Sequence, residues 1–172
     1  EQMKKLNFTF EINDINKELK DLSKLNNKKI NLINVNYTFK SCFEIITSKS
    51  NRYIDETFEI ALNFIKQNNL SKFINGPVSK KSFLKGKILG ITEYLATKTK
   101  KKDVVMLIFN KNLSVSPLTT HLALKDVHKK ITKQKIYTQV KLINKFYKTK
   151  FNKMPSIAIT GLNPHCESNF QN

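Results

Sequence analysis

The chain has 172 residues, 40% of them hydrophobic, with only four glycines and four prolines, which excludes a fibrous or disordered chain and allows one globular domain. No apolar run approaches the roughly 20 residues of a membrane-spanning helix, and the first residues do not form a secretory signal, so we expect a cytoplasmic protein without a membrane partner. The net charge of +18 raises nucleic acid as a partner, but Arg52 is the only arginine and the lysines are dispersed, so we expect solvated surface lysines and no nucleic acid.

The N-terminal part combines two strand patterns with one long helix. Alternating apolar residues predict a strand over 6–12, and a β-branched run predicts another over 30–35. After capping candidates at 48–51, apolar residues recur on one face of a helix that ends near 68–69. These apolar residues are Ile54, Phe58, Leu62 and Ile65.

Two loops with special backbone residues follow. A short strand at 73–75 continues into Gly76-Pro77-Val78-Ser79-Lys80, after which a helix is expected over 81–84. The turn Leu89-Gly90-Ile91-Thr92-Glu93 is expected to open a helix over 94–100, with Thr92 at or near its N-cap. Backbone N–H groups at such a helix start, together with the threonine hydroxyl, favour a phosphate or carboxylate ligand.

The C-terminal part predicts a hairpin, a capped helix and a last strand. A continuous apolar run predicts a strand over 104–109, and Asn110-Lys111-Asn112 predicts a tight connection to 113–115. Thr132 is expected to cap a helix with one apolar face, and a final strand is expected over 157–160. The apolar residues of that helix are Ile136, Val140, Ile143 and Tyr147.

Helices that alternate with short strands predict an α/β fold: three α/β/α layers around a mainly parallel sheet with one hairpin. We expect residues 1–172 to form a single partial unit of such a fold, because the chain does not begin with Met and ends soon after its last motif. In open α/β sheets ligands bind outside the carboxyl ends of the strands, so the loops at these ends are candidate sites.

Two histidines follow strand patterns in this way. His121 comes directly after the apolar run 115–118, and His165 follows the last strand through a turn of Gly, Asn and Pro. One hypothesis is that both imidazoles bind one divalent metal; the other is that each is a hydrogen-bonded loop residue. Cys166 is either a thiolate ligand or a small residue that fills the loop, and His128 is expected to face solvent.

Four motifs occur in an order and at spacings that resemble those of one enzyme family. They are Gly76-Pro77-Val78-Ser79-Lys80, Gly90-Ile91-Thr92-Glu93, Thr119-Thr120-His121-Leu122 and Gly161-Leu162-Asn163-Pro164-His165. They resemble the 4-hydroxythreonine-4-phosphate dehydrogenases of pyridoxal phosphate biosynthesis, whose fold is similar to that of the isocitrate and isopropylmalate dehydrogenases. The resemblance implies an NAD-dependent homodimer that oxidises and decarboxylates a small phosphorylated substrate, 4-phosphooxy-L-threonine, with a divalent metal such as Zn, Mg or Co.

The resemblance also implies roles for individual residues, although it assigns no catalytic residue. His121 and His165 match two of the three metal-binding histidines of the family. Thr92 matches a threonine that binds substrate near its phosphate, and Lys80 matches a loop lysine that we place among the substrate-binding residues. Ile91 stands where the family has a histidine, so one hydrogen-bonding substrate contact is lost.

The departures from the family pattern leave alternatives open. The third metal histidine and most of the nicotinamide site have no counterpart here, so we expect these residues alone to be inactive. A related dehydrogenase that acts on a phosphorylated four-carbon sugar acid, such as 4-phospho-threonate, would share the motifs, and Ile91 is compatible with that change of substrate. The other alternative is a truncated, inactive homologue that acts as a binding or dimerisation module.

Overall fold

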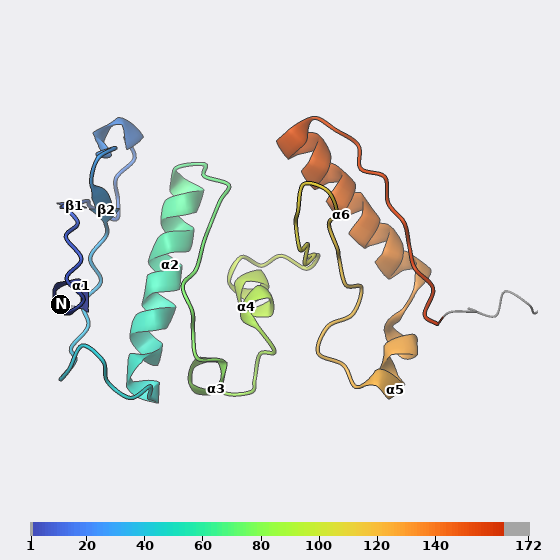
Figure 1. Cartoon of the computed structure of the whole chain (residues 1–172), viewed down its shortest axis with the longest axis horizontal. Helices are drawn as coiled ribbons and strands as arrows, with labels where there is room; N and C mark the ends of the chain where they lie inside the picture. The colour runs from blue at the N-terminus through green and yellow to red at the C-terminus, as the bar shows by residue number, and fades with distance from the viewer. Residues whose placement is uncertain (1, 164–172) are drawn as a thin grey trace, which may run out of the picture. The chain divides into compact units, whose positions relative to one another are not determined.

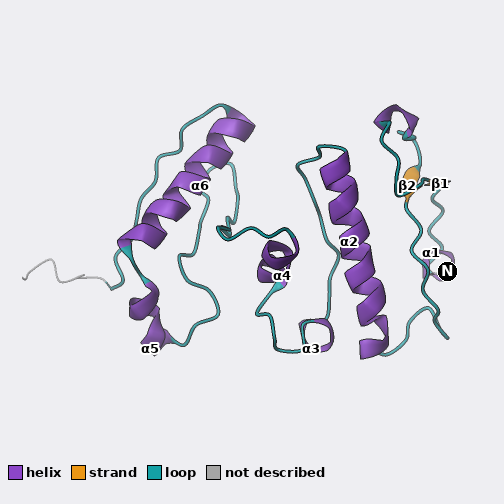
Figure 2. Cartoon of the chain, turned by 180° about the vertical axis from the view of Figure 1, so that it is seen from behind, coloured by secondary structure: helices purple, strands orange, loops and turns teal. Residues whose placement is uncertain are grey.

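The computed structural model describes residues 2–163 of the chain. Two compact units meet in sequence at helix α4 (Ile91–Lys98), with residues 1–91 in unit 1 and residues 92–172 in unit 2. Helices form most of the regular structure, and a small parallel sheet lies in unit 1 (Figures 1 and 2). The chain is therefore of the α/β class, as the sequence predicts. Within the described residues, no helix combines the length and the apolar character that crossing a membrane requires.

The sheet of unit 1 is a parallel pair of short strands. Strand β1 (Ile12–Asp14) lies beside strand β2 (Ile30–Leu32), with Asn13 opposite Asn31. The side chains of this middle pair also interact, because Asn13 Nδ2 donates to Asn31 Oδ1 at 2.8 Å. The strand predicted over 30–35 is present but shorter, whereas the strand predicted over 6–12 was largely wrong, because only Ile12 of that range lies in β1. Strand position and length depend on a hydrogen-bonded neighbour that the apolar pattern does not specify.

Short helical turns flank the sheet and the long helix of unit 1. They are α1 (Gln2–Lys5), η1 (Leu22–Lys24), η2 (Ser48–Ser50) and α3 (Lys80–Phe83). Side-chain caps begin three of these turns; at η1, Asp21 accepts hydrogen bonds from the hydroxyl and the backbone N–H of Ser23. The same two bonds lower the pKa of the Asp21 carboxyl below its ordinary value, because they favour its ionised form.

Helix α2 (Asn51–Gln67) confirms the predicted amphipathic helix. Its apolar face includes Phe58, which is only 5% exposed. The ring of Phe58 lies 5.9 Å from that of Phe73 and 6.1 Å from that of Phe83, so an aromatic cluster joins α2 to the chain that follows it. Ser50 precedes the helix and makes no side-chain capping bond.

Three of the predicted strands do not form. Residues 73–75, 104–109 and 157–160 belong to no strand in the structure, and Ile74 is 95% exposed. A β-branched or apolar run is compatible with a strand, but a ladder also needs a partner with free backbone groups at the right distance. These predictions were wrong because the local pattern contains no information about that partner.

The hairpin of unit 2 is present as one antiparallel bridge and its turn. The backbone N–H of Ile108 donates to the carbonyl of Val115 at 2.8 Å, and the reverse bond measures 3.0 Å. Ser114 Oγ closes the connection by accepting from the Asn110 N–H at 3.2 Å and donating to the Asn110 carbonyl at 3.1 Å. The tight turn predicted at Asn110-Lys111-Asn112 is therefore confirmed.

Helix α6 (Lys133–Phe151) is the long helix of unit 2 and follows the short turns α5 (Leu124–Val127) and η3 (His128–Lys130). Thr132 caps it as predicted, since its Oγ1 accepts from the Lys135 N–H at 3.2 Å. Asn152 ends it in the left-handed conformation, with φ of 51°, which asparagine tolerates better than most residues. Polar and conformational signals in the sequence thus determine both ends of α6.

Side chains of α6 hold the second arm of the hairpin. Gln139 Nε2 donates to Ser116 Oγ at 2.7 Å and lies 3.3 Å and 3.2 Å from the backbone carbonyl oxygens of Ser116 and Pro117. Farther along the helix, the Tyr147 hydroxyl donates to Ser114 Oγ at 2.9 Å. Because the later helix residue binds the earlier hairpin residue, α6 runs antiparallel to this arm.

Few side chains of the described residues are buried. Only Phe58, Leu84 and Tyr94 are, at 5%, 5% and 6% exposure, whereas many large apolar side chains are more than a third exposed. A domain of this length normally buries well over half of the surface that its unfolded chain exposes. The arrangement therefore leaves much apolar surface without a cover.

Replacing Gln139 by Ala should loosen the hairpin arm that leads toward the loop at His121. We expect a loss of about 1 kcal/mol for each bond removed, and so roughly fivefold or greater acceleration of hydrogen exchange at the Ile108 and Val115 amides. Gln134→Ala is the matched control, since Gln134 lies on the same helix and has only a long 3.4 Å bond to Thr138. Equal exchange rates in both variants would contradict the role of Gln139.

Candidate functional site

The motif Gly90-Ile91-Thr92-Glu93 lies at the start of helix α4. The helix begins at Ile91, three residues before the predicted start, so Thr92 is its second residue, near the N-cap position but not at it. Thr92 is exposed, while Ile91 is half-buried and Gly90 is buried. The first backbone N–H groups of a helix have no partner within the helix, so this exposed hydroxyl stands beside unpaired donors and suits an anionic ligand.

Lys80 is the first residue of α3 and is exposed, so its ammonium group is accessible. The preceding residue caps this turn, because Ser79 Oγ accepts from the Ser82 N–H at 3.3 Å. Asn51 Nδ2 donates to the Ser82 carbonyl at 2.8 Å, which ties the turn to the start of α2. Lys80 therefore projects from an anchored turn and not from a free loop.

His121 lies in the loop between the hairpin and α5, and its side chain is exposed. Its backbone is left-handed, with φ of 57°, a conformation that costs a non-glycine residue about 1–2 kcal/mol and is enriched at functional sites. The loop is anchored upstream by the bonds of Gln139 to Ser116 and Pro117. An imidazole in this position is open to a ligand.

The second predicted metal ligand, His165, lies outside the described residues, as does Cys166. The pairing of His121 with His165 therefore stays a prediction. Within residues 2–163 no group of three histidine, cysteine or carboxylate side chains is close enough to hold a metal ion. Thr92 and His121 belong to unit 2, whereas Lys80 and Ile91 belong to unit 1.

The remaining histidine behaves as an ordinary surface residue. His128 opens the turn η3 and is exposed, which confirms the prediction that it faces solvent. Near it, Lys129 Nζ lies 2.9 Å from Asp126 Oδ1 in an exposed ion pair, which contributes little to stability. His121 and His128 are both exposed, and His121 differs from His128 in its left-handed backbone and in its position within a family motif.

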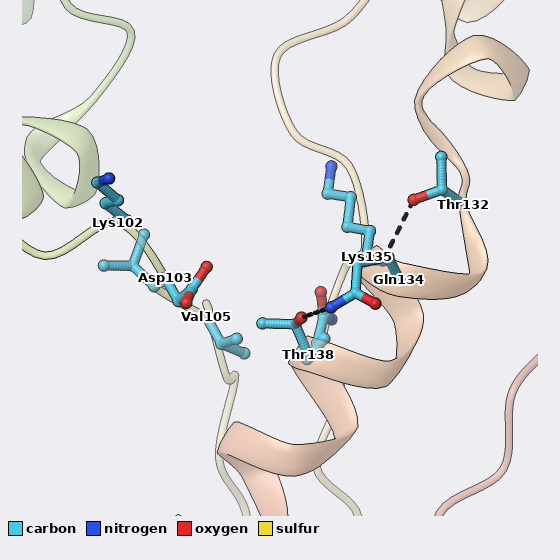
Figure 3. A pocket seen from close by; sticks show the side chains of 9 residues that line it. Lys102, Asp103, Val105, Thr132, Gln134, Lys135 and Thr138 are labelled. Carbon is cyan, nitrogen blue, oxygen red and sulfur yellow. Dashed lines mark hydrogen bonds between the residues drawn. The ribbon is translucent and has the colours of Figure 1, made fainter.

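A hollow of about 320 Å³ lies within unit 2 beside the start of α6 (Figure 3). Figure 3 shows Lys102, Asp103 and Val105 on one side of it and side chains of α6 on the other. The residues that line it are Lys102, Asp103, Val104, Val105, Thr132, Gln134, Lys135, Thr138 and Gln139. No motif in the sequence marks this hollow. Lysines occur throughout the chain, so Lys102 and Lys135 do not stand out in the sequence. It contains no histidine or cysteine and is not the predicted metal site.

Comparison with known proteins supports the family resemblance that the four motifs indicate. Residues 1–170 match the family model described as "Pyridoxal phosphate biosynthetic protein PdxA". A protein of Sulfurihydrogenibium sp. (strain YO3AOP1) named 4-hydroxythreonine-4-phosphate dehydrogenase is 35% identical over 160 residues, which make up 91% of this chain and 49% of that protein. A protein of the same name from Colwellia psychrerythraea (strain 34H / ATCC BAA-681) is 35% identical over 123 residues, 70% of this chain and 38% of that protein.

A shorter and more similar stretch is shared with the protein of that name from Neisseria meningitidis serogroup A / serotype 4A (strain DSM 15465 / Z2491). It is 46% identical over 77 residues, 44% of this chain and 23% of that protein. The chain spans about half the length of the first of these relatives and less of the other two. The family resemblance seen in the four ordered motifs is confirmed: the chain belongs to the PdxA family of pyridoxal phosphate biosynthetic proteins.

Proposed function

We propose that the protein is an NAD-dependent dehydrogenase that oxidises and decarboxylates 4-phosphooxy-L-threonine in pyridoxal 5'-phosphate biosynthesis. The observation that supports this most directly is the family match over residues 1–170, together with relatives named 4-hydroxythreonine-4-phosphate dehydrogenase. The activity belongs to the whole protein, and the present residues alone are expected to be inactive, because they span about half the length of the first relative.

In this proposal the substrate phosphate binds at the start of α4. Thr92 donates its hydroxyl, and the free N–H groups of the first turn add backbone donors and the positive end of the helix dipole. Lys80 is the other proposed substrate-binding residue, and its ammonium group is exposed. Each of the two side chains is accessible to an anionic group, which supports the assignment.

His121 and His165 are the proposed metal ligands, and imidazole nitrogen fits Zn²⁺ or Co²⁺ by donor type and Mg²⁺ less well. A divalent metal at these imidazoles would lower the pKa of the substrate hydroxyl and so favour hydride transfer to NAD. The part of this chain is to hold the His121 ring in place: the left-handed backbone of His121 and the bonds of Gln139 to the preceding arm restrict the loop. A catalytic site of this kind needs a third protein ligand, which we place outside residues 2–163.

The finer features of the fold belong to the same proposal. We place the chain in a three-layer α/β/α arrangement similar to the isocitrate and isopropylmalate dehydrogenases, in a cytoplasmic homodimer that shares its active site between subunits. The parallel direction of β1 and β2 supports this assignment, because three-layer α/β folds are built on parallel sheets.

A second candidate is the oxidation of a phosphorylated four-carbon sugar acid such as 4-phospho-threonate. Ile91 favours it, since an apolar side chain at the start of α4 replaces the family histidine and removes a hydrogen bond to substrate. Pockets that gain or lose a hydrogen-bonding group discriminate sharply between related substrates. An inactive homologue that acts as a binding or dimerisation module is the remaining alternative; the absence of a three-ligand cluster within residues 2–163 is compatible with it.

The substrate test uses the protein expressed from its native gene, with NAD and a divalent metal. We expect NADH to form with 4-phosphooxy-L-threonine at a higher kcat/KM than with 4-phospho-threonate. The Ile91→His variant should raise kcat/KM for 4-phosphooxy-L-threonine about tenfold, because it restores one hydrogen bond. A preference for 4-phospho-threonate would select the second candidate, and no NADH with either substrate would exclude both.

The metal assignment has a matched control within the chain, since His121 and His128 are both exposed. His121→Ala should weaken metal binding by about 100-fold or more, because even residues that only orient a ligand contribute 10–100-fold. His128→Ala should keep both metal and activity. Metal retained after dialysis against a chelator is measured by mass spectrometry of the element, beside NADH formation. If both variants retain metal equally, His121 is not a ligand.

A further inference from the structure

The loop between α2 and α3 contains the dipeptide Asn75-Gly76, whose glycine begins the first of the four motifs. At no other place in the sequence does glycine follow asparagine. The backbone nitrogen that follows an asparagine is a nucleophile for the side-chain carbonyl carbon when the chain can bring the two together. Glycine favours this approach, because it has no Cβ in the way and adopts backbone conformations that other residues avoid.

Both residues of the pair are accessible and lie in the irregular segment that joins the two helices (Figure 1). Asn75 and Gly76 are exposed, and the preceding Ile74 is 95% exposed. Within residues 2–163 the Gly76 N–H donates to no acceptor, whereas most backbone N–H groups of a folded chain are paired. No hydrogen bond in the described part of the chain therefore has to break before this nitrogen loses its proton.

The Asn75 side chain is turned toward the peptide group that would attack it. Its Nδ2 donates to the Gly76 carbonyl oxygen at 3.0 Å, so the side-chain amide lies beside the Gly76 backbone. A Cβ built at Gly76 would have no heavy atom within 4 Å, which shows that the space beside the attacking residue is open. The local geometry thus brings the two reacting groups together without an obstacle.

Both ends of this loop are anchored in unit 1. Before it, the ring of Phe73 lies 5.9 Å from that of Phe58. After it, Ser79 Oγ accepts from the Ser82 N–H, and Asn51 Nδ2 donates to the Ser82 carbonyl at 2.8 Å. The residues between these anchors can change their conformation while the helices on either side keep their contacts. A chemical change at Asn75 is therefore compatible with the fold.

We propose that Asn75 is a site of spontaneous deamidation, in which water is the co-reactant. The Gly76 nitrogen loses its proton to solvent and forms a bond to Asn75 Cγ, and the bond from Cγ to Nδ2 breaks. The departing amide takes up a proton and leaves as ammonia, so that a cyclic succinimide remains. Water then adds to a ring carbonyl carbon and breaks its bond to the Gly76 nitrogen, which regains a proton. Opening at Cγ gives aspartate, and opening at the backbone carbonyl gives isoaspartate.

Either product places a carboxylate in the loop that leads to Lys80. The isoaspartate also lengthens the backbone of this loop by one methylene group. A negative charge near an ammonium group weakens the attraction of that region for anions. The modification therefore lowers the affinity of the loop for anionic groups as the protein ages. The inference depends on the residues of the loop and not on the proposed reaction.

The rate of conversion at single asparagines tests the proposal in the protein expressed from its native gene. After incubation at mildly alkaline pH, peptide mapping by mass spectrometry measures the fraction of each asparagine that has become an acid. Asn112 is the matched control, since it is exposed in irregular backbone but is followed by Leu113. We expect Asn75 to convert about tenfold faster or more, because glycine leaves the attacking nitrogen unobstructed. Equal rates, or an unchanged Asn75, would overturn the proposal.

The Gly76→Ala variant tests the chemical route. The open space beside Gly76 accommodates a methyl group, and Gly76 is not left-handed, so the variant should fold as the unmodified chain does. Conversion of Asn75 should slow by about tenfold, because the added Cβ restricts the approach of the nitrogen. In the unmodified chain the product should contain isoaspartate, detected by enzymatic methylation of its carboxylate. An undiminished rate in the variant, or aspartate as the sole product, would overturn the succinimide route.

Discussion

The packing of α6 against the preceding hairpin determines the structure of unit 2. Gln139 and Tyr147 bind serines of the second arm, and the ring of Phe109 stacks on that of Phe151 at 5.3 Å. Polar bonds near the start of the helix and aromatic contacts near its end fix both the position and the direction of the arm. His121 follows this arm directly, so the contact that stabilises the unit also limits where its imidazole can lie.

The extent to which apolar side chains are buried differs between parts of the chain, and regular structure is most extensive where they are buried. In unit 1 the rings of Phe73 and Phe83 bury Phe58, and α2 is well defined as a result. In unit 2, Leu113 and Val115 of the hairpin remain 74% and 53% exposed. Short strands and isolated bridges are the expected consequence, because a sheet with one open apolar face gains little from extending its ladder.

Helices were predicted well from the sequence, and strands were not. The spacing of Ile54, Phe58, Leu62 and Ile65 predicted α2, and Thr132 predicted the start of α6. These signals are local, since both amphipathic spacing and N-capping involve residues a few positions apart. The strand at 157–160 was predicted from a local run alone, and no ladder forms there because a strand also requires a distant partner.

The same distinction applies to the candidate site: single residues could be identified from local motifs, but contacts between distant residues could not. Motif order identified the family, and the structure places Thr92 at a helix start and His121 in an exposed loop with a left-handed backbone. The roles of both residues stay predictions. The convergence of His121 and His165 could not be deduced from spacing, because it depends on the path of the whole chain. The hollow beside α6 was missed, since lysine, threonine and glutamine at its rim form no motif.

These residues belong to the PdxA family, and we propose that the whole protein is a metal-dependent dehydrogenase. The most direct test is the intact mass of the native gene product, with its metal content measured on the same sample. The account predicts a mass near twice the 20.0 kDa of this chain and about one divalent metal per subunit, because the first relative is about twice as long and two histidines match metal ligands. A mass equal to that of the present chain, without bound metal, would contradict it.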